Sequence, residues 1–256
     1  MASLSIAKAE RVHPRALFRV GVITLLLLLC AVPHALLRLV TRRSPFARLF
    51  LRLAARAAGA KVTICGTPTQ HDVLYIANHV SWLDILVLSG HTGCAFVAKA
   101  DMVDWPVLGW MATLNNSVYV QRESRLDVGA QRDAIQSALL TGQPIALFPE
   151  GTTANGRELL PFRSSLLATV APPPSGVSIQ PVAINYGTVA PEIAWTEDES
   201  VGVNALRLMA RKGRLPVTLH FLDPLDPADF DDRKAMAAHS REVIAATLFP
   251  DYGPAA

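Results

Sequence analysis

The sequence predicts an α/β fold, in which a mixed, largely parallel sheet is flanked by helices and preceded by an N-terminal helical membrane anchor. Three observations predict it. From residue 61 onward, short β-rich runs alternate with helical runs, which is typical of α/β proteins. Residues 20–37 are apolar and carry no Asp, Glu, Lys or Arg. Polar clusters directly follow two of the apolar runs, and sites in α/β sheets lie at such strand ends.

The length and charge of the chain set its organisation. It has 256 residues, of which 51% are hydrophobic and 18% charged, with a net charge of +3. Residues 1–61 hold eleven Lys/Arg and one acid, whereas the rest holds thirteen bases and twenty acids. We therefore predict a membrane-associating helical segment over residues 1–58 and one α/β domain over residues 59–256. Disordered, fibrous and polytopic membrane proteins are excluded.

The apolar stretch Val20–Leu37 allows three interpretations. A signal peptide requires a cleavage site of small residues, and Ala31–Ala35 is a poor one. A spanning helix requires about 20 apolar residues. This stretch is slightly short and is interrupted by Pro33 and His34. Basic residues at both ends leave the orientation of such a spanning helix open. The third interpretation is an anchor that enters the membrane without crossing it.

The following segment favours membrane anchoring. Ser44 and Pro45 are typical of a helix start, and Gly59 of a helix end. Apolar residues and arginines fall on opposite faces of this helix, which suits the boundary of an anionic membrane. An ordinary amphipathic helix packed on the domain is the alternative. The apolar face is Phe46, Leu49, Phe50 and Leu53, and the arginines are Arg48, Arg52 and Arg56.

Two further classes of protein are not expected. The basic residues are interleaved with long apolar stretches, so nucleic-acid binding is not predicted. The three cysteines, Cys30, Cys65 and Cys94, form no Cys-x-x-Cys or Cys/His cluster. We therefore expect no disulfide framework and no metal site, and a reducing compartment.

The body of the chain contains thirteen predicted elements. The predicted strands are Lys61–Cys65, Val73–Ala77, Cys94–Ala98, Ser117–Gln121, Ile145–Phe148, Val177–Asn185 and Pro216–Phe221. The predicted helices are Trp82–Leu88, Pro106–Leu114, Arg125–Leu140, Ser164–Val170, Val201–Ala210 and Asp232–Leu248.

His79 and Asp84 form the first candidate catalytic pair. They follow the apolar strand Val73–Ala77 and precede a helical run, which is where α/β sheets carry catalytic residues. In that geometry Asp84 accepts a hydrogen bond from one imidazole nitrogen and leaves the other free as a general base. The alternative is a His–Asp pair that only satisfies a loop.

The second cluster, Phe148–Thr153, directly follows the strand ending at Phe148. Gly151, Thr152 and Thr153 predict a polar turn whose backbone N–H groups bind an oxyanion. Glu150 would repel a phosphate there, so we expect it to bind a substrate hydroxyl or to hold a nearby arginine. A plain strand–turn is the alternative.

Three further residues complete the candidate set. Arg122 ends a predicted strand and Arg163 enters a predicted helix, so each is a candidate phosphate ligand or an ordinary surface arginine. Pro181 lies inside an apolar strand, which places that strand at a sheet edge or beside a cleft.

Together these elements resemble the glycerolipid acyltransferase family, which includes the 1-acylglycerol-3-phosphate acyltransferases. The matching blocks, over residues 78–184, are Asn-His-x-x-x-x-Asp, a strand ending in arginine, Phe-Pro-Glu-Gly-Thr, Pro-Phe-Arg and the strand with an internal proline. The resemblance implies that His79, oriented by Asp84, deprotonates a lysophospholipid hydroxyl, which attacks an acyl thioester directly. It also implies that Arg122, Gly151, Thr152 and Arg163 hold the acceptor's phosphate, and that Glu150 orients the acceptor or those arginines.

The resemblance sets the expected function. The acyl donor would be acyl-CoA or acyl-carrier protein, the product phosphatidic acid, and the location the inner membrane with the site facing the cytoplasm; no cofactor is expected. Gln121, Thr153 and Ser165 depart from the family's usual residues, which is compatible with another acceptor such as lyso-ornithine lipid. A membrane-anchored lipid hydrolase and a non-catalytic lipid-binding protein are the alternatives from other classes.

Overall fold

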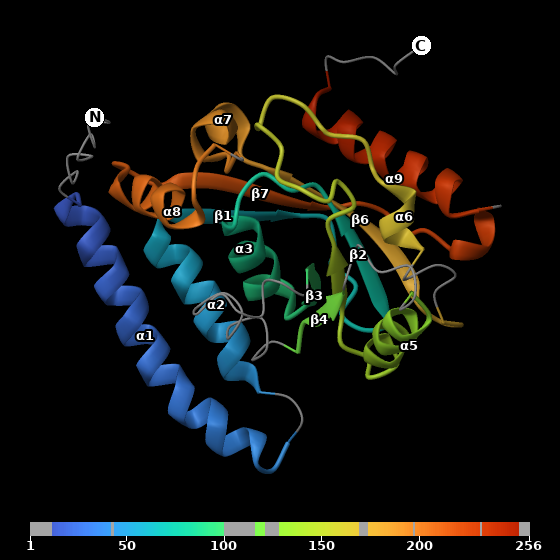
Figure 1. Cartoon of the computed structure of the whole chain (residues 1–256), viewed down its shortest axis with the longest axis horizontal. Helices are drawn as coiled ribbons and strands as arrows, with labels where there is room; N and C mark the ends of the chain where they lie inside the picture. Colours follow the sequence, from blue (N-terminus) through green and yellow to red (C-terminus); the bar gives the residue numbers. More distant parts are fainter. Residues whose placement is uncertain are drawn as a thin grey trace, which may run out of the picture.

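The computed structural model describes residues 12–41, 44–99, 116–120, 128–168, 174–196, 198–230 and 232–250. They form a seven-stranded sheet in the order β1-β7-β6-β2-β5-β3-β4 (Figure 1). Every neighbouring pair is parallel except β6 and β7. The predicted fold class is therefore confirmed. The strands are β1 (Ala60–Cys65), β2 (Val73–Ala77), β3 (Ala95–Lys99), β4 (Val118–Val120), β5 (Ile145–Leu147), β6 (Ser178–Asn185) and β7 (Leu215–Phe221).

The helices also follow the predicted order, and all seven predicted strands are present with small shifts at their ends. The predicted helix at 106–114 lies outside the described residues. The α-helices are α1 (Pro14–Arg38), α2 (Pro45–Ala58), α3 (Leu83–Thr92), α5 (Val128–Leu139), α6 (Ser164–Leu167), α7 (Ala190–Ile193), α8 (Val201–Ala210) and α9 (Arg233–Leu248). Short 3-10 turns lie at η3 (Gly187–Val189) and η4 (Pro227–Asp229).

Both faces of the sheet are covered by helices. Alternate residues of β2 point to opposite faces, as the two-residue period of a strand requires. Val73 and Tyr75 join the apolar cluster beneath α2, α3 and α8, whereas Leu74 and Ile76 join the cluster beneath α5, α6 and α9. β2 is buried throughout and lies near the middle of the sheet. Its carboxyl end is consequently a fixed platform for the residues that follow.

The prediction that the proline strand lies at an edge or beside a cleft is wrong for the sheet position, because β6 lies between β7 and β2. Pro181 has no N–H to donate toward β7, although its carbonyl still accepts from the amide of Leu222 at 3.0 Å. The carbonyl of Leu222 instead accepts from the buried Gln180 side-chain Nε2 at 2.9 Å. A side-chain amide thus replaces the missing backbone donor, which permits the proline in an interior strand.

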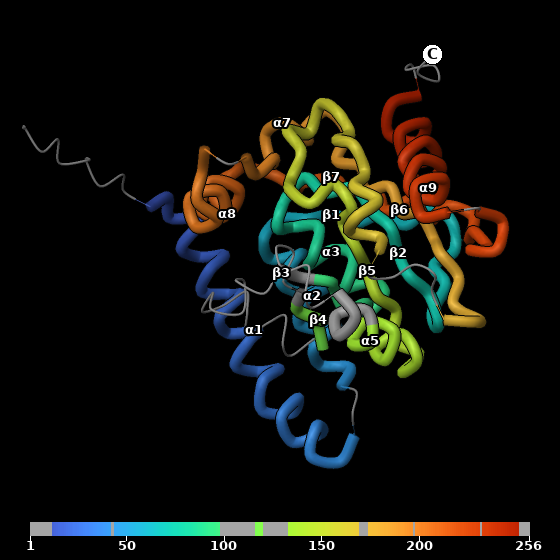
Figure 2. Tube along the Cα trace, turned by 45° about the vertical axis from the view of Figure 1, so that its right-hand side comes forward, coloured from blue at the N-terminus to red at the C-terminus, as the bar shows by residue number. Residues whose placement is uncertain are grey.

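The first helix lies along the outside of the molecule (Figure 2). α1 continues through Pro33, so the predicted interruption does not end it. By length and composition α1 is able to cross a membrane, and only 11% of its most apolar 18-residue window is buried. Large apolar side chains such as Phe18, Leu29 and Val32 are exposed along it. This exposure supports contact of α1 with lipid.

The second helix packs between α1 and α3. α2 begins after Ser44, whose hydroxyl accepts from the amide of Phe46, and it ends at Gly59 in the left-handed conformation, as predicted. Phe50 and Leu51 are buried, and a Cβ added at Gly90 of α3 would lie 2.7 Å from the α2 backbone. The two helices therefore touch at a glycine contact. This is the packed amphipathic arrangement that the sequence left as an alternative, while the division at residues 58 and 59 stays a prediction.

Candidate active site

The candidate site lies at the carboxyl ends of three adjacent parallel strands. His79 follows β2, Glu150 follows β5 and Tyr186 follows β6. The order β6-β2-β5 places His79 between the other two. Asn78 fixes this turn, because its side chain accepts from the amide of Ile184 at 2.7 Å and donates to the same residue's carbonyl at 3.1 Å. The amide side chain extends the pairing of β2 with β6 past the end of the strand.

His79 and Asp84 are in direct contact, as the sequence predicted. Their Nδ1 and Oδ2 atoms lie 2.8 Å apart, which makes Nδ1 the protonated nitrogen when the ring is neutral. Nε2 of His79 makes no hydrogen bond within the described residues, and 14% of the side chain is exposed. The ring is therefore held at one nitrogen and open at the other, which is the arrangement of a general base.

Asp84 is fully buried and receives four hydrogen bonds. Besides His79, its Oδ2 accepts from the amides of Val80 at 2.7 Å and Ser81 at 2.9 Å. Its Oδ1 accepts from the hydroxyl of Tyr186 at 2.6 Å. Burial, and next the charge of Asp84, raise the pKa of Tyr186 well above its ordinary value, so the phenol remains a donor. These donors compensate the burial of the carboxylate.

Sequence reasoning missed Tyr186, which lies 102 positions after Asp84. Its only signal was its place directly after a strand, at the edge where the other site residues gather. Recognising that signal requires knowing that β6 neighbours β2, and strand order is not readable from the spacing of motifs.

Glu150 is buried and binds backbone groups. Its Oε1 accepts from the amide of His79 at 2.6 Å, and its Oε2 accepts from the amide of Leu160 at 2.9 Å. Burial raises the pKa of Glu150 to about 7; these two amides oppose the rise, Asp84 adds to it and Arg241 opposes it. The sequence assigned Glu150 to an acceptor hydroxyl or an arginine. In the structure it ties the loop after β5 to the backbone of the proposed base.

Phe148 forms a wall beside the proposed base. Its ring is stacked on the imidazole of His79, with centroids 4.1 Å apart and planes 8° apart. Phe96 also stacks on Phe148, with ring centroids 5.5 Å apart. The carbonyl of His79 accepts from the amide of Ala154 at 2.7 Å. The histidine is thus fixed by its ring and at both its backbone amide and its carbonyl.

The structure brings Gly151 and Arg163 together. Gly151 has φ +77°, and a Cβ there would lie 3.2 Å from Leu166 and 3.4 Å from the Arg163 side chain. Arg163 is exposed, and its amide donates to the carbonyl of Pro149 at 2.8 Å. Thr152 follows Gly151 and is half-buried. A cation, a hydroxyl and a glycine turn are therefore held by the loop that contacts His79 through Glu150 and Ala154, whereas Arg122 lies outside the described residues.

The comparisons with known proteins fit this site. Residues 61–185 match the family model described as Acyltransferase, a range that includes His79, Asp84, Glu150 and Arg163. A lyso-ornithine lipid O-acyltransferase of Rhodobacter capsulatus is 33% identical over 197 residues, covering 73% of this chain and 70% of that protein. The chain belongs to this acyltransferase family.

One further relative and one solved structure are also similar to this chain. A 1-acyl-sn-glycerol-3-phosphate acyltransferase of Neisseria gonorrhoeae is 32% identical over 205 residues and covers 78% of each chain. The crystal structure of the acyltransferase PlsC of Thermotoga maritima superimposes with a TM-score of 0.61, covering 91% of this chain and 95% of that chain, at 21% identity. This structural likeness shows a shared fold.

Proposed function

We propose that this acyltransferase moves an acyl chain from a thioester to the free hydroxyl of a lysolipid, with His79 as the general base. One observation carries the proposal. Nδ1 of His79 is hydrogen-bonded to the buried Asp84, while Nε2 makes no hydrogen bond within the described residues. Such a base needs a proton donor, and the relatives are named as lysolipid acyltransferases.

The reaction balances without a covalent enzyme intermediate. Nε2 takes the hydroxyl proton as the oxygen attacks the thioester carbonyl and forms the new C–O bond. The C–S bond then breaks, and His79 returns the proton to the leaving thiolate. Asp84 stabilises the imidazolium that forms between these steps. The scheme uses a base and positioned reactants, so we propose no metal or resident cofactor in it.

The acceptor we propose is 1-acylglycerol-3-phosphate, which gives phosphatidic acid. Arg163 and the turn at Gly151 and Thr152 support it, because a guanidinium beside a glycine turn suits a phosphate. We also assign Arg122 to this phosphate on its sequence motif. The acceptor would reach the site from the surrounding membrane lipids.

Lyso-ornithine lipid is the second candidate acceptor. Several relatives are named lyso-ornithine lipid O-acyltransferases, and Gln121, Thr153 and Ser165 depart from the usual motifs. This lipid has no phosphate, so the arginines would bind its carboxylate instead.

The donor and the location complete the proposal. We propose acyl-CoA or acyl-carrier protein as the donor, and the inner membrane with the site facing the cytoplasm, where both thioesters occur. The exposed apolar face of α1 supports membrane association.

A transfer assay on the full chain tests this function. Wild type and His79→Ala are given acyl-CoA or acyl-carrier protein with a panel of lysolipids that includes both candidates. We expect one acceptor to be strongly preferred and His79→Ala to lower kcat by about 10²–10⁴-fold. Near-native transfer by His79→Ala would disprove the base. Fatty acid released without acceptor acylation would indicate a hydrolase instead.

A further inference from the structure

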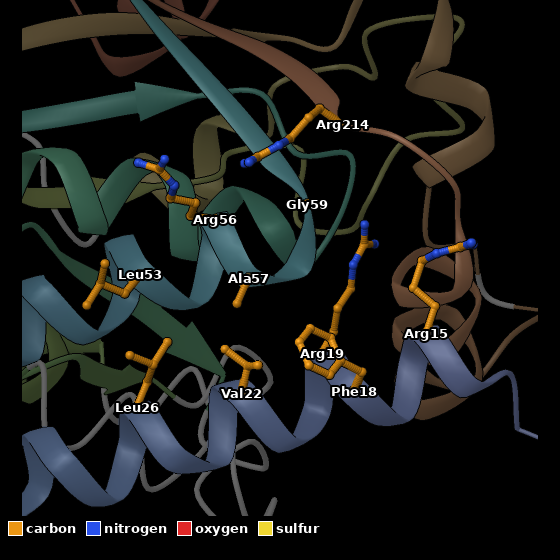
Figure 3. Close-up of a pocket in the computed structure, with 10 residues that line it drawn as sticks. All are labelled: Arg15, Phe18, Arg19, Val22, Leu26, Leu53, Arg56, Ala57, Gly59 and Arg214. Carbon is orange, nitrogen blue, oxygen red and sulfur yellow. The ribbon is translucent and has the colours of Figure 1, made fainter.

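A cavity of about 590 Å³ lies between α1, α2 and the start of β7 (Figure 3). None of its lining residues belongs to the candidate active site. The lining divides into a basic part and an apolar part. The residues are Arg15, Phe18, Arg19, Val22, Leu26, Leu53, Arg56, Ala57, Gly59 and Arg214.

The basic part holds four arginines, and no carboxylate lines it within the described residues. Two of them are fixed by backbone carbonyls at helix ends: Arg15 donates to Ala210 of α8 at 2.8 Å, and Arg19 donates to Ala58 of α2 at 3.2 Å. Cations at these ends are favoured by the helix dipoles, but they remain close to each other. No Asp or Glu forms an ion pair with these arginines in the part of the chain that the structure describes.

The other two arginines are exposed. Arg56 and Arg214 form no ion pair within the described residues. By contrast, two arginines near Arg214 in sequence are paired: Arg207 with Glu199 and Arg211 with Glu192, each at 2.8 Å. These two arginines outside the cavity are therefore paired with carboxylates, whereas the four that line it form no ion pair within the described residues.

The apolar part continues from the arginines along α1. Figure 3 shows Val22 and Leu26 of α1 facing Ala57 and Leu53 of α2 across the cavity. Phe18 also lines it and is 71% exposed, so this wall is open toward the exterior. Further exposed apolar residues follow on α1, at Leu25, Leu29, Val32 and Leu36. A charged end and a long apolar wall match a molecule with an anionic head and a hydrocarbon chain.

We propose that this cavity binds an anionic phospholipid of the bilayer. Its phosphate lies among the arginines of the basic part, and its acyl chain lies along Phe18, Val22, Leu26 and Leu53. The size fits, since ligand cavities typically span about 300–1,000 Å³. The lipid would join α1 to α2, α8 and the sheet, so this site holds the enzyme on anionic membranes and is separate from the acceptor site.

Lipid binding by the full-length protein in neutral detergent tests the proposal. Bound phosphatidylglycerol is counted by native mass spectrometry, and its affinity is obtained from the rise in Tm during titration. We expect one tightly bound lipid in the wild type and about tenfold or weaker affinity in Arg56→Gln/Arg214→Gln. The control Arg233→Gln/Lys234→Gln removes the same charge from exposed positions at the start of α9, and should bind like wild type.

Two further experiments test the apolar part and the basic part of the cavity separately. Phe18→Ser, at an exposed position, should weaken phosphatidylglycerol binding and leave the response to inorganic phosphate unchanged. If sn-glycerol 3-phosphate stabilises the protein as much as phosphatidylglycerol, the acyl chain plays no part and the proposal fails. Equal lipid affinity in the two double variants also overturns it. Transfer to detergent-solubilised lysolipid should stay near wild type in all of them, which separates this test from that of the proposed function.

Discussion

The carboxylate of Glu150 accepts a hydrogen bond from the backbone amide of His79, with 2.6 Å between Oε1 and N. The two residues are 71 positions apart in sequence and follow neighbouring strands of the sheet. The proposed base is therefore positioned through its main chain by one acidic residue, Glu150, and through its ring by another, Asp84. Each of these two contacts leads to a separate prediction.

Asp84→Asn should lower kcat at least about a hundredfold with little change in KM. The substituted amide has one acceptor oxygen, whereas Oδ1 and Oδ2 together accept four hydrogen bonds in the wild type. Tyr186→Phe removes only one of these four and keeps the ring, so we expect a kcat loss of about tenfold. Steady-state kinetics with the preferred lysolipid measure both. A larger loss of kcat in Tyr186→Phe than in Asp84→Asn would contradict the assignment of Asp84 as the residue that orients His79.

Glu150 should make stability depend on pH. Burial raises its pKa from an ordinary value of 4.5 to about 7, so the folded protein holds this proton more tightly than the unfolded chain. The resulting stabilisation, on the order of 3 kcal/mol, is complete below pH 4.5 and is lost as the pH rises through about 7. Glu150→Gln should flatten the fall in Tm across this range.

The control for Glu150 is Glu158→Gln, which changes an exposed glutamate in the same loop. It should leave the pH profile of Tm as in the wild type. At neutral pH, Glu150→Gln also turns an N–H donor toward the amide of either His79 or Leu160, so kcat should fall as well. A profile of Glu150→Gln that is identical to the wild type would show that the carboxyl does not titrate in this range.

Gly151→Ala should weaken acceptor binding in addition to straining the backbone. Gly176 is a matched control, because it also has positive φ, +85° against +77°, but no atom lies within 4 Å of a Cβ there. Gly176→Ala should cost about 1–2 kcal/mol of stability and leave KM unchanged. Gly151→Ala should cost at least as much and raise KM for the lysolipid, because its methyl group crowds Leu166 and Arg163. If Gly151→Ala and Gly176→Ala had the same KM for the lysolipid, the turn at Gly151 would not take part in acceptor binding.

Gln180→Leu should destabilise the fold by about 2–4 kcal/mol without changing the chemistry. It removes the donor to the carbonyls of Leu222 and Thr67 and the acceptor for the amide of Thr69. Thermal unfolding should detect the loss, while kcat per folded molecule stays near wild type. Gln70→Leu, at an exposed position in the neighbouring loop, should have little effect. A small loss in Gln180→Leu would mean that Pro181 needs no replacement donor.

The sequence predicted the parts of the fold that depend on local pattern. The seven strands follow from β-rich runs, and the ends of α2 follow from Ser44, Pro45 and Gly59. The His79–Asp84 contact was predictable because both residues lie on one turn between a strand and a helix. These features depend on neighbours within a few positions.

The features that were missed depend on strand order. Tyr186 reaches Asp84, and Glu150 reaches the backbone of His79, only because β6 and β5 flank β2. The interior proline was misplaced for a related reason, since Gln180 supplies its donor through a side chain and leaves no periodic signal. The packing of α2 on α3 through Gly90 is likewise a contact between surfaces, not a pattern within either helix.

The stacking of Phe148 on His79 bears on how this enzyme would limit hydrolysis of its acyl thioester. A general base activates water as readily as an alcohol, so a thioester at this site is exposed to hydrolysis whenever a water molecule reaches Nε2. Phe148 covers one face of the imidazole, and Asp84 occupies its Nδ1 edge. The remaining approach is the Nε2 edge, where a bound lysolipid would stand in the path of water. Selectivity for the lipid alcohol would then come from blocking the other routes, in addition to any preference of the base itself.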